Sequence, residues 1–268
     1  KTSWHLHLHT EYSLLDGACR IKPLIAAAKN LGQTSLAITD HGAMFGAINF
    51  YKEAVAQGIK PIIGCEMYMA SRRLFNKEGK EDQKAYHLVV LAKNLTGYHN
   101  LVKLVSKAWT EGFYMRPRTD HAELEKYHEG LICCSACLGG EIPKKISAGD
   151  LEAAEKAIMW HKNLFGDDYY LELQLHKATV ERANHEVYPL QLEVNKHLIE
   201  FSNRLGVKMI CSNDVHFVDE AHAEAHDRLI CLSTSRDLDD PKRMLYSKQE
   251  WMKTRAEMNA IFEDVPEA

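Results

Sequence analysis

The sequence predicts an α/β protein and, within that class, a closed TIM-like (β/α) barrel of about seven strands. Short apolar runs alternate with amphipathic stretches along its 268 residues, which favours parallel strands joined by helical crossovers. Side chains that can bind metals follow nearly every apolar run. A closed barrel brings all such strand ends together, whereas an open sheet concentrates its site at one switch point. We therefore expect the barrel.

The expected elements alternate in order along the chain. The apolar runs predict strands at 4–9, 35–39, 61–69, 86–92, 130–137, 169–175 and 208–212. Helical periodicity predicts helices from Ile21 to Leu31 before Gly32, over 48–55 before Gly58, and over 190–205 before Gly206. Residues 71–84 and 111–128 interrupt the pattern as an exposed loop and an insertion. The chain divides into a barrel over 1–218 and a helical extension over 219–268.

Composition limits the protein class. The chain is 46% hydrophobic and 26% charged, as in ordinary soluble proteins. It has no run long enough to span a membrane and no secretory signal, so we expect a cytoplasmic protein without a membrane partner. Seven cysteines are too sparse for a disulfide scaffold. A net charge of -4 lacks the basic excess of a free-standing nucleic-acid binder. The 15 histidines exceed what a core needs and indicate chemistry.

The first motif is residues 4–10, Trp-His-Leu-His-Leu-His-Thr. Side chains on a strand alternate between faces, so His5, His7 and His9 would share one face and could bind a metal at the strand end. Asp16 could add an oxygen ligand. Surface histidines on an edge strand explain the same pattern equally well.

Two further motifs end other strands. Residues 38–42, Ile-Thr-Asp-His-Gly, place Asp40 and His41 between an apolar run and a helix, which suits a metal ligand or a general base. A capping aspartate is an equally good interpretation. Near the seventh strand, Asp214 and His216 share a face and aim a carboxylate and an imidazole the same way.

Three strands supply single candidates. Glu66 could bridge two cations or form a strand-end salt bridge. His87 could be a ligand or a partly buried structural histidine. Cys137 could act as a lone thiolate ligand, because no second cysteine pair has zinc-ribbon spacing and a strand interior is the wrong place for a thioredoxin-type motif.

Together these groups exceed the needs of one tetrahedral ion and imply two or three cations. Imidazole mixed with carboxylate suits zinc, manganese or iron better than magnesium or calcium. Clustered cations are typical of phosphoester hydrolysis. The residues thus indicate a metallophosphoesterase. The expected ligands are His7, His9, Asp16, His41, Glu66, His87, Cys137, Asp214 and His216.

These motifs resemble a known family. His7-x-His9-Thr10 with residues 12–17 (Tyr-Ser-Leu-Leu-Asp-Gly), then 38–42, then Asp214-x-His216-Phe217, resemble motifs of the polymerase and histidinol phosphatase (PHP) domain superfamily. Residues 46–51, 58–64, 112–118 and 238–243 are similar, more closely, to the PHP domains of bacterial DNA polymerase III alpha subunits. The resemblance covers essentially the whole chain.

The resemblance implies a distorted seven-stranded barrel with a trinuclear site at its C-terminal mouth. The nine expected ligands match family ligand positions, with Cys137 where many relatives have histidine. Because the full set is present, the resemblance implies a 3′-to-5′ proofreading exonuclease. Asp40, His41 and Glu66 are the catalytic candidates for this activity. His5 and His176 do not match family ligand positions and are candidate substrate contacts.

The same resemblance implies partners: the primer 3′ end of DNA, the remaining polymerase domains, and the proofreading and clamp subunits of the replicase. The chain looks like an excised domain that leads toward a polymerase core, without that core's acidic palm motif. Arg116 is a candidate phosphate contact, as are Arg72 and Arg73. Two other functions remain open: a metal-stabilised structural module without turnover, and a small-molecule phosphatase or pyrophosphatase.

Overall fold

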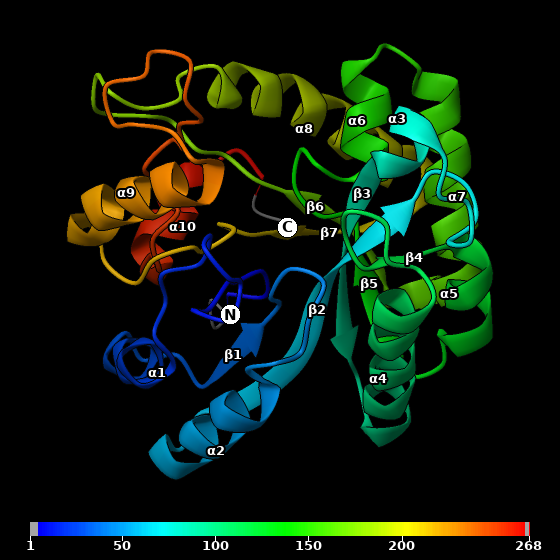
Figure 1. Cartoon of the computed structure of the whole chain (residues 1–268), viewed down its shortest axis with the longest axis horizontal. Coiled ribbons are helices and arrows are strands. Elements are labelled where there is room, and N and C mark those ends of the chain that lie inside the picture. The colour runs from blue at the N-terminus through cyan, green and yellow to red at the C-terminus, as the bar shows by residue number, and fades with distance from the viewer. Residues whose placement is uncertain (1–4, 266–267) are drawn as a thin grey trace.

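A single curled sheet organises the protein in the computed structural model, which describes residues 5–265 and 268 (Figure 1). Within this described part the strands follow the spatial order β1-β2-β3-β5-β6-β7, and β4 pairs with β2. They are β1 (Ser35–Ile38), β2 (Lys60–Ala70), β3 (Ala85–Ala92), β4 (Arg118–Thr119), β5 (Leu131–Cys134), β6 (Tyr169–Leu173) and β7 (Lys208–Cys211). The expected strands 35–39 to 208–212 are thus present, most of them slightly shortened.

The direction of β3 departs from the sequence-based prediction. β1 pairs with β2, β5 with β6, and β6 with β7 in parallel, but β3 runs antiparallel to both β2 and β5. A parallel return needs a crossover of a dozen or more residues, usually a helix packed on the sheet. The 71–84 connection contains only the five-residue helix α3 (Gly79–Gln83), so the chain turns back beside β2. The expectation of an all-parallel sheet was wrong here.

The structure also differs from the prediction of a first strand over residues 4–9. Trp4 lies outside the described residues, and residues 5–10 form isolated bridges, Leu8 with Val215 and Thr10 with Cys19. The segment nevertheless contacts both ends of the sheet, since Ala37 N donates to His5 O and Val215 N donates to His7 O. The mixed α/β class is confirmed, while the described part of the chain forms a curled half-barrel rather than a regular seven-stranded barrel.

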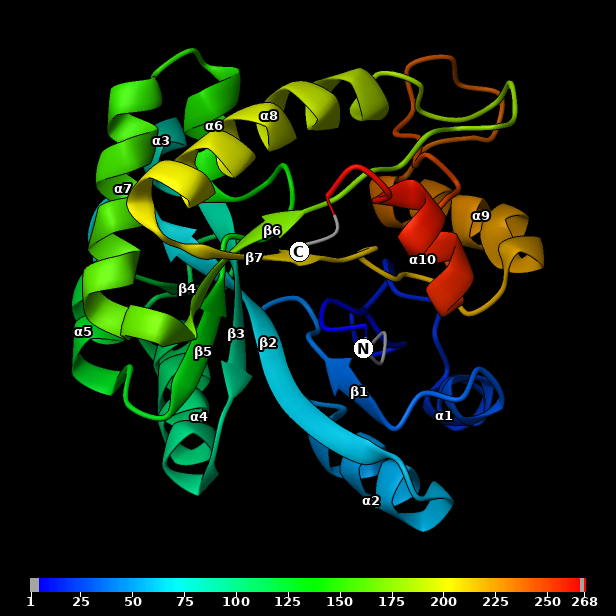
Figure 2. The same cartoon turned by 180° about the vertical axis from the view of Figure 1, so that it is seen from behind.

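Helices cover the outside of the sheet on two flanks. Helices α4 to α7 lie together on one flank, and α1, α2, α9 and α10 lie on the other, as the reverse view also shows (Figure 2). The helices besides α3 are α1 (Ile21–Asn30), α2 (Ala47–Gln57), α4 (Leu95–Thr110), α5 (His121–Tyr127), α6 (Glu141–Ser147), α7 (Leu151–Phe165), α8 (Val187–Leu205), α9 (Ala223–Thr234) and α10 (Arg255–Ile261). In the described residues, no helix is long and apolar enough to cross a membrane.

Glycine ends the helices where the sequence predicts it. Gly58 caps α2 and Gly206 caps α8, both in the left-handed conformation with φ of 77° and 64°. Gly32, with φ of 72°, follows α1. Glycine adopts this conformation without steric cost, so each helix stops and the chain turns toward the next strand.

Two layers of apolar side chains show that the sheet curls. On its inner face, residues from β1, β2, β3, β5, β6 and β7 pack in one cluster, together with residues beside those strands. They are Leu6, Ala37, Ile62, Val89, Leu91, Ile132, Cys134, Ala136, Tyr170 and Ile210. Residues from such distant strands meet only if the sheet bends around them.

Alternate residues of the strands face outward. Leu88 and Val90 of β3 pack in the larger outer cluster, which also holds Leu104 of α4. Met258 of α10 and Phe262 belong to this same cluster. The 219–268 region therefore packs against the rest of the protein, and the boundary at 218 stays a sequence-based prediction.

Candidate metal centre

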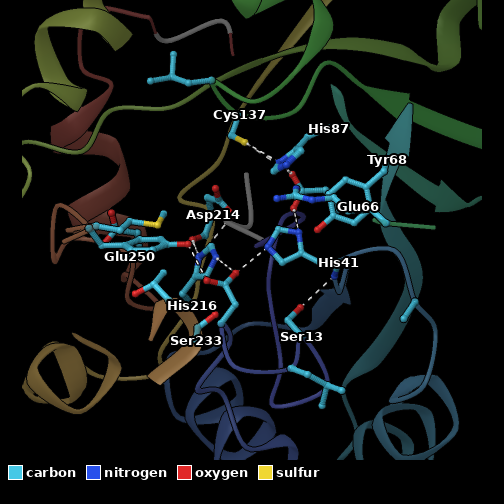
Figure 3. Close-up of a pocket in the computed structure, with 18 of the residues that line it drawn as sticks. Ser13, His41, Glu66, Tyr68, His87, Cys137, Asp214, His216, Ser233 and Glu250 are labelled. Atoms are coloured by element: carbon cyan, nitrogen blue, oxygen red, sulfur yellow. Dashed lines mark hydrogen bonds and ion pairs between the residues drawn. The ribbon is translucent and has the colours of Figure 1, made fainter. Parts of the chain in front are cut away.

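The loops that follow the strands surround a cavity of about 800 Å³. The side chains of His41, Glu66, His87, Cys137, Asp214 and His216 point toward one another from different elements (Figure 3). Seven of the nine expected ligands line the cavity directly, and His7 and His9 lie buried beneath it. The lining ligands are Asp16, His41, Glu66, His87, Cys137, Asp214 and His216, of which Glu66 is itself almost fully buried.

Glu66, on β2, occupies the middle of the cluster. Its Oε2 lies 3.0 Å from His9 Nε2, 3.0 Å from His41 Nδ1 and 3.4 Å from His7 Nε2. Its Oε1 lies 2.7 Å from His87 Nδ1 and 3.7 Å from Cys137 Sγ. The two oxygens therefore face different ligand groups, as a carboxylate that bridges two cations must.

Asp214 faces the same imidazoles from the opposite side. Its Oδ1 lies 3.1 Å from His7 Nε2 and 3.2 Å from His9 Nε2. The residue has a φ of 46° although it is not glycine. Such strained backbone is concentrated at functional sites, where surrounding structure compensates for its cost.

A second group lies nearer to solvent. Asp16 Oδ2 is 2.7 Å from His41 Nε2 and 3.1 Å from His216 Nε2. On the other side of Glu66, His87 Nδ1 and Cys137 Sγ are 3.4 Å apart. All nine expected ligands thus belong to one continuous cluster.

Five buried atoms of this cluster have no hydrogen-bond partner within the described structure. They are His7 Nε2, His9 Nε2, His41 Nδ1, Glu66 Oε2 and Asp214 Oδ1. Leaving a buried polar atom without a hydrogen bond costs about 1–3 kcal/mol, and one shared cation would satisfy several of these atoms at once. Imidazole nitrogens and carboxylate oxygens converging on one point are the donor set of divalent transition-metal ions, and the residues fit such ions.

Comparison with known proteins identifies the family of this chain. A family model described as the PHP domain matches residues 5–176. The chain belongs to the PHP domain family. DNA polymerase III subunit alpha of Borreliella burgdorferi is 47% identical over 98% of the chain, and those of Treponema pallidum and Thermus aquaticus are each 43% identical over the same share. This PHP chain spans about a fifth of the length of these relatives, 22% of the first.

Solved structures share the fold only loosely with this PHP chain. A structure from Bifidobacterium adolescentis, described as a candidate metal-dependent phosphoesterase, is 13% identical with a TM-score of 0.46, covering 97% of this chain and 96% of its own. An amidohydrolase from Chromobacterium violaceum is 14% identical with a TM-score of 0.38, covering 80% and 87%. Neither likeness bears on the activity.

The charges in the PHP cluster stabilise one another. Burial alone would raise the pKa of Asp16, but His216 and His41 outweigh it and hold that pKa far below its usual range. Burial would lower the pKa of His216, but Asp16 and Asp214 raise it to about 9. Burial and Glu66 raise the pKa of the Cys137 thiol well above its usual value. The thiol therefore keeps its proton unless a cation takes its place.

Glu172 is a functional residue that the sequence interpretation missed. It lies on β6 between two leucines, is 2% exposed, and its Oε1 is 2.7 Å from His7 Nδ1. Gln174 Nε2 donates to the same oxygen. The signal in the sequence that could have identified this residue is a carboxylate within an apolar strand. Carboxylates that hold metal-binding histidines in this way fix the ring orientation and raise its basicity.

Asp40 lies behind the ligands and is absent from the lining of the cavity. Its two oxygens accept bonds from Thr10 N, Thr10 Oγ1 and Ser13 Oγ, and Ser13 Oγ is 2.9 Å from His9 Nδ1. Burial raises the pKa of this carboxyl. The geometry makes Asp40 a group that positions His9 through Ser13, rather than the proton-transfer group that the sequence predicted. His41 and Glu66, the other two predicted catalytic residues, do face the cluster.

His5 does not share a face with His7 and His9. Its Nε2 is 3.0 Å from Lys253 O, away from the cavity, and burial lowers its pKa to about 4. Residues 5–10 do not form a regular strand, so strict alternation does not apply to them. The predicted substrate contact by His5 is therefore corrected.

The other two predicted substrate contacts, His176 and Arg116, do line the cavity. The His176 ring is held by Asn213 O and Gln191. The Arg116 guanidinium lies 4.9 Å over the Tyr68 ring at the mouth. Both remain predicted contacts.

The other two candidate phosphate contacts form ion pairs with acidic residues. Arg72 pairs with Asp82 and Arg73 pairs with Asp120, so neither is a free phosphate contact.

The C-terminal region also reaches the centre. Tyr246 OH donates to Asp16 Oδ1 at 2.8 Å, and His226 Nε2 is 2.8 Å from Asp16 O. Burial, with a contribution from His216, lowers the pKa of His226 to about 4, so this imidazole is neutral and donates to the carbonyl. Asp16 is thereby fixed from a part of the sequence more than two hundred residues away, which no local motif could indicate.

Proposed function

We propose that this chain is the PHP domain of a bacterial replicative DNA polymerase alpha subunit and hydrolyses DNA phosphodiesters from the 3′ end. The observation that carries the proposal is the group of five buried ligand atoms, Glu66 Oε2 among them, that converge without hydrogen bonds in the described structure. Nine ligands are enough for three ions, with zinc, manganese or iron the cations that suit the donors. When bound, such cations activate water for attack and neutralise charge that develops on the phosphate.

Different residues of the metal centre have different roles in this proposal. His7 and His9 hold the inner part of the cluster, and Glu66 links it to His87 and Cys137. The His41 and Asp16 pair, each about 19% exposed, lies where a proton can be exchanged with solvent. Arg116 offers positive charge to a phosphate that enters through the mouth.

An aromatic rim favours a nucleic-acid strand over a small phosphate ester. Phe45, Trp109 and Phe113 line the cavity while 55%, 40% and 45% exposed. Phe45 and Trp109 have ring centroids 5.6 Å apart, and Trp109 stacks on Phe113 at 5.7 Å. Aromatic side chains beside a positive group are a stacking surface for the bases of a single strand.

The polymerase relatives indicate how this chain would meet its DNA substrate. A net charge of -4 gives the chain little affinity for DNA by itself. The remaining polymerase domains would deliver the primer 3′ end, and proofreading and clamp subunits would be further partners.

The test measures nucleotide release from a single-stranded oligonucleotide labelled near its 3′ end, with manganese or zinc added. We expect the parent chain to release nucleotides and His9→Ala to lose at least 100-fold in rate, because His9 lies at the centre of the cluster. His99→Ala, which removes an exposed histidine of α4, is the matched control and should behave as the parent.

Equal release by the parent and His9→Ala would contradict the proposal. Metal binding without any release, both alone and in the complete polymerase, would favour a metal-stabilised structural module.

A further inference from the structure

A second group of ligand-type side chains lies on the flank formed by α5, α6 and α7 (Figure 1). His121 begins α5, Glu141 begins α6, and His161 lies on α7. One ligand atom from each lies within 4.8 Å of the other two. None of the three lines the cavity of the metal centre.

His161 presents a free lone pair to this cluster. The side chain is 0% exposed, and its Nδ1 is 2.8 Å from Ala157 O. A carbonyl oxygen can only accept, so Nδ1 carries the proton and donates. Nε2 is therefore an acceptor, and it has no hydrogen-bond partner in the described structure. Metal-binding histidines are commonly held by a backbone carbonyl in this manner.

Glu141 adds a second acceptor without a donor. Lys145 Nζ binds its Oε1 at 2.7 Å, which leaves Oε2 buried and without a hydrogen bond. Burial would raise the pKa of Glu141, but His121 and Lys145 outweigh it and lower it to about 2. Burial lowers the pKa of His161 to about 4. One ligand atom of Glu141 and one of His161 lie within 4.8 Å of each other, so two buried residues with an acceptor that lacks a hydrogen bond belong to one cluster.

His121 completes the group. Its Nε2 lies 3.5 Å from Glu141 Oε2 and its side chain is 38% exposed. Tetrahedral zinc with bonds of about 2.0–2.2 Å separates neighbouring ligand atoms by roughly 3.4 Å. The His121 and Glu141 atoms already have that spacing. The exposure of His121 leaves the fourth position open to water.

We propose that His121, Glu141 and His161 form a second binding site for a divalent transition-metal ion, zinc by its donor set, outside the metal centre. The ion would satisfy the two buried acceptors that lack hydrogen bonds, and it would link α5, α6 and α7. We expect its effect to be structural, because none of its three residues lines the cavity. The inference does not depend on the proposed hydrolysis.

The test counts metal in the full chain. After chelator treatment, the protein is reloaded with zinc, freed of excess ion by gel filtration, and analysed by mass spectrometry for zinc per chain. We expect His121→Ala and Glu141→Gln each to lose one ion relative to the parent. Lys145→Gln is the matched control, because it breaks the Lys145 contact to Glu141 and leaves all three ligands in place.

The position of the ion needs its own measurement, because a variant could lose metal through misfolding. Circular dichroism checks that His121→Ala keeps its secondary structure, and this side chain is exposed enough to truncate safely. A crystal of the zinc-loaded chain should show an anomalous peak between the three ligands. An unchanged zinc count in folded His121→Ala, or a position that contains only a water molecule, would overturn the proposal.

Discussion

Glu172 shows how a single buried side chain tunes the metal centre. Its carboxylate accepts from His7 Nδ1, which leaves His7 Nε2 directed at Glu66 and Asp214. Glu172→Gln keeps the shape but removes the charge that makes the imidazole basic. We expect metal affinity to fall about 10- to 100-fold, measured by competition with a chelating dye. Glu155→Gln, an acid of α7 paired with Arg204, is the control. Equal affinity in both variants would refute a role for Glu172.

Trp109 is the residue on which substrate preference can be tested. Its Nε1 donates to Gly42 O at 2.8 Å, which fixes the ring beside Phe113. A base stacked on an aromatic ring contributes roughly 1–3 kcal/mol. Trp109→Ala should therefore raise KM for an oligonucleotide about 5- to 100-fold, with cleavage of a small phosphodiester that lacks nucleobases unchanged. Phe75→Ala removes an exposed aromatic outside the cavity and serves as control. A similar loss on both substrates would contradict the stacking surface.

The kind of chemistry could be predicted from single residues, but the direction of each side chain could not. Histidine, carboxylate and thiol groups after apolar runs identified the residues that the structure gathers around Glu66. His5 follows the same spacing as His7 and His9 yet bonds to Lys253 O. In the sequence, Glu172 is only one charged residue within an apolar strand. Only the tertiary structure decides which face of each segment meets the cavity.

At the scale of elements, Arg118 of β4 holds two irregular segments together. Its guanidinium is 0% exposed and donates to the carbonyls of Gly112, Leu74, Asn76 and Asp82. Arg118→Met would leave these carbonyls without their donor. We expect a loss of at least about 3 kcal/mol in the free energy of unfolding and faster hydrogen exchange over 71–84.

Chemical denaturation measures the change in stability. Arg204→Met, which removes an exposed ion pair with Glu155, should cost under about 1 kcal/mol. If Arg118→Met cost no more than Arg204→Met, the proposed role of Arg118 would be wrong.

Helix ends and strand positions could be predicted because local physics determines them. Gly58 and Gly206 end α2 and α8 through their left-handed backbone. The antiparallel direction of β3 could not be predicted in this way, because an apolar run has the same composition in either direction. That direction follows from the 71–84 connection, whose charged residues fold around Arg118 and Asp82 rather than forming a long crossover helix.

At the scale of the whole molecule, the metal centre joins the first described segment to the segment that follows β7. His7 and His9 come from the first described segment, while Asp214 and His216 follow β7. The curled sheet has no continuous ladder between these segments, only isolated bridges such as Leu8 with Val215. Ligands shared by one ion across this junction would close the half-barrel, so cation binding and folding should be coupled.

Metal removal should therefore lower the thermal stability of the whole chain. A ligand that binds only the folded state adds about 2.7 kcal/mol at a concentration 100 times its Kd. For a protein of this size that corresponds to roughly 5–10 °C in Tm. We expect Tm, measured by differential scanning fluorimetry, to fall by that amount with a chelator and to recover with zinc or manganese. His9→Ala should lose most of the shift, because His9 lies between Glu66 and Asp214, whereas His99→Ala should keep it. An equal shift in all three proteins would place the stabilising ion elsewhere and separate the fold from the centre.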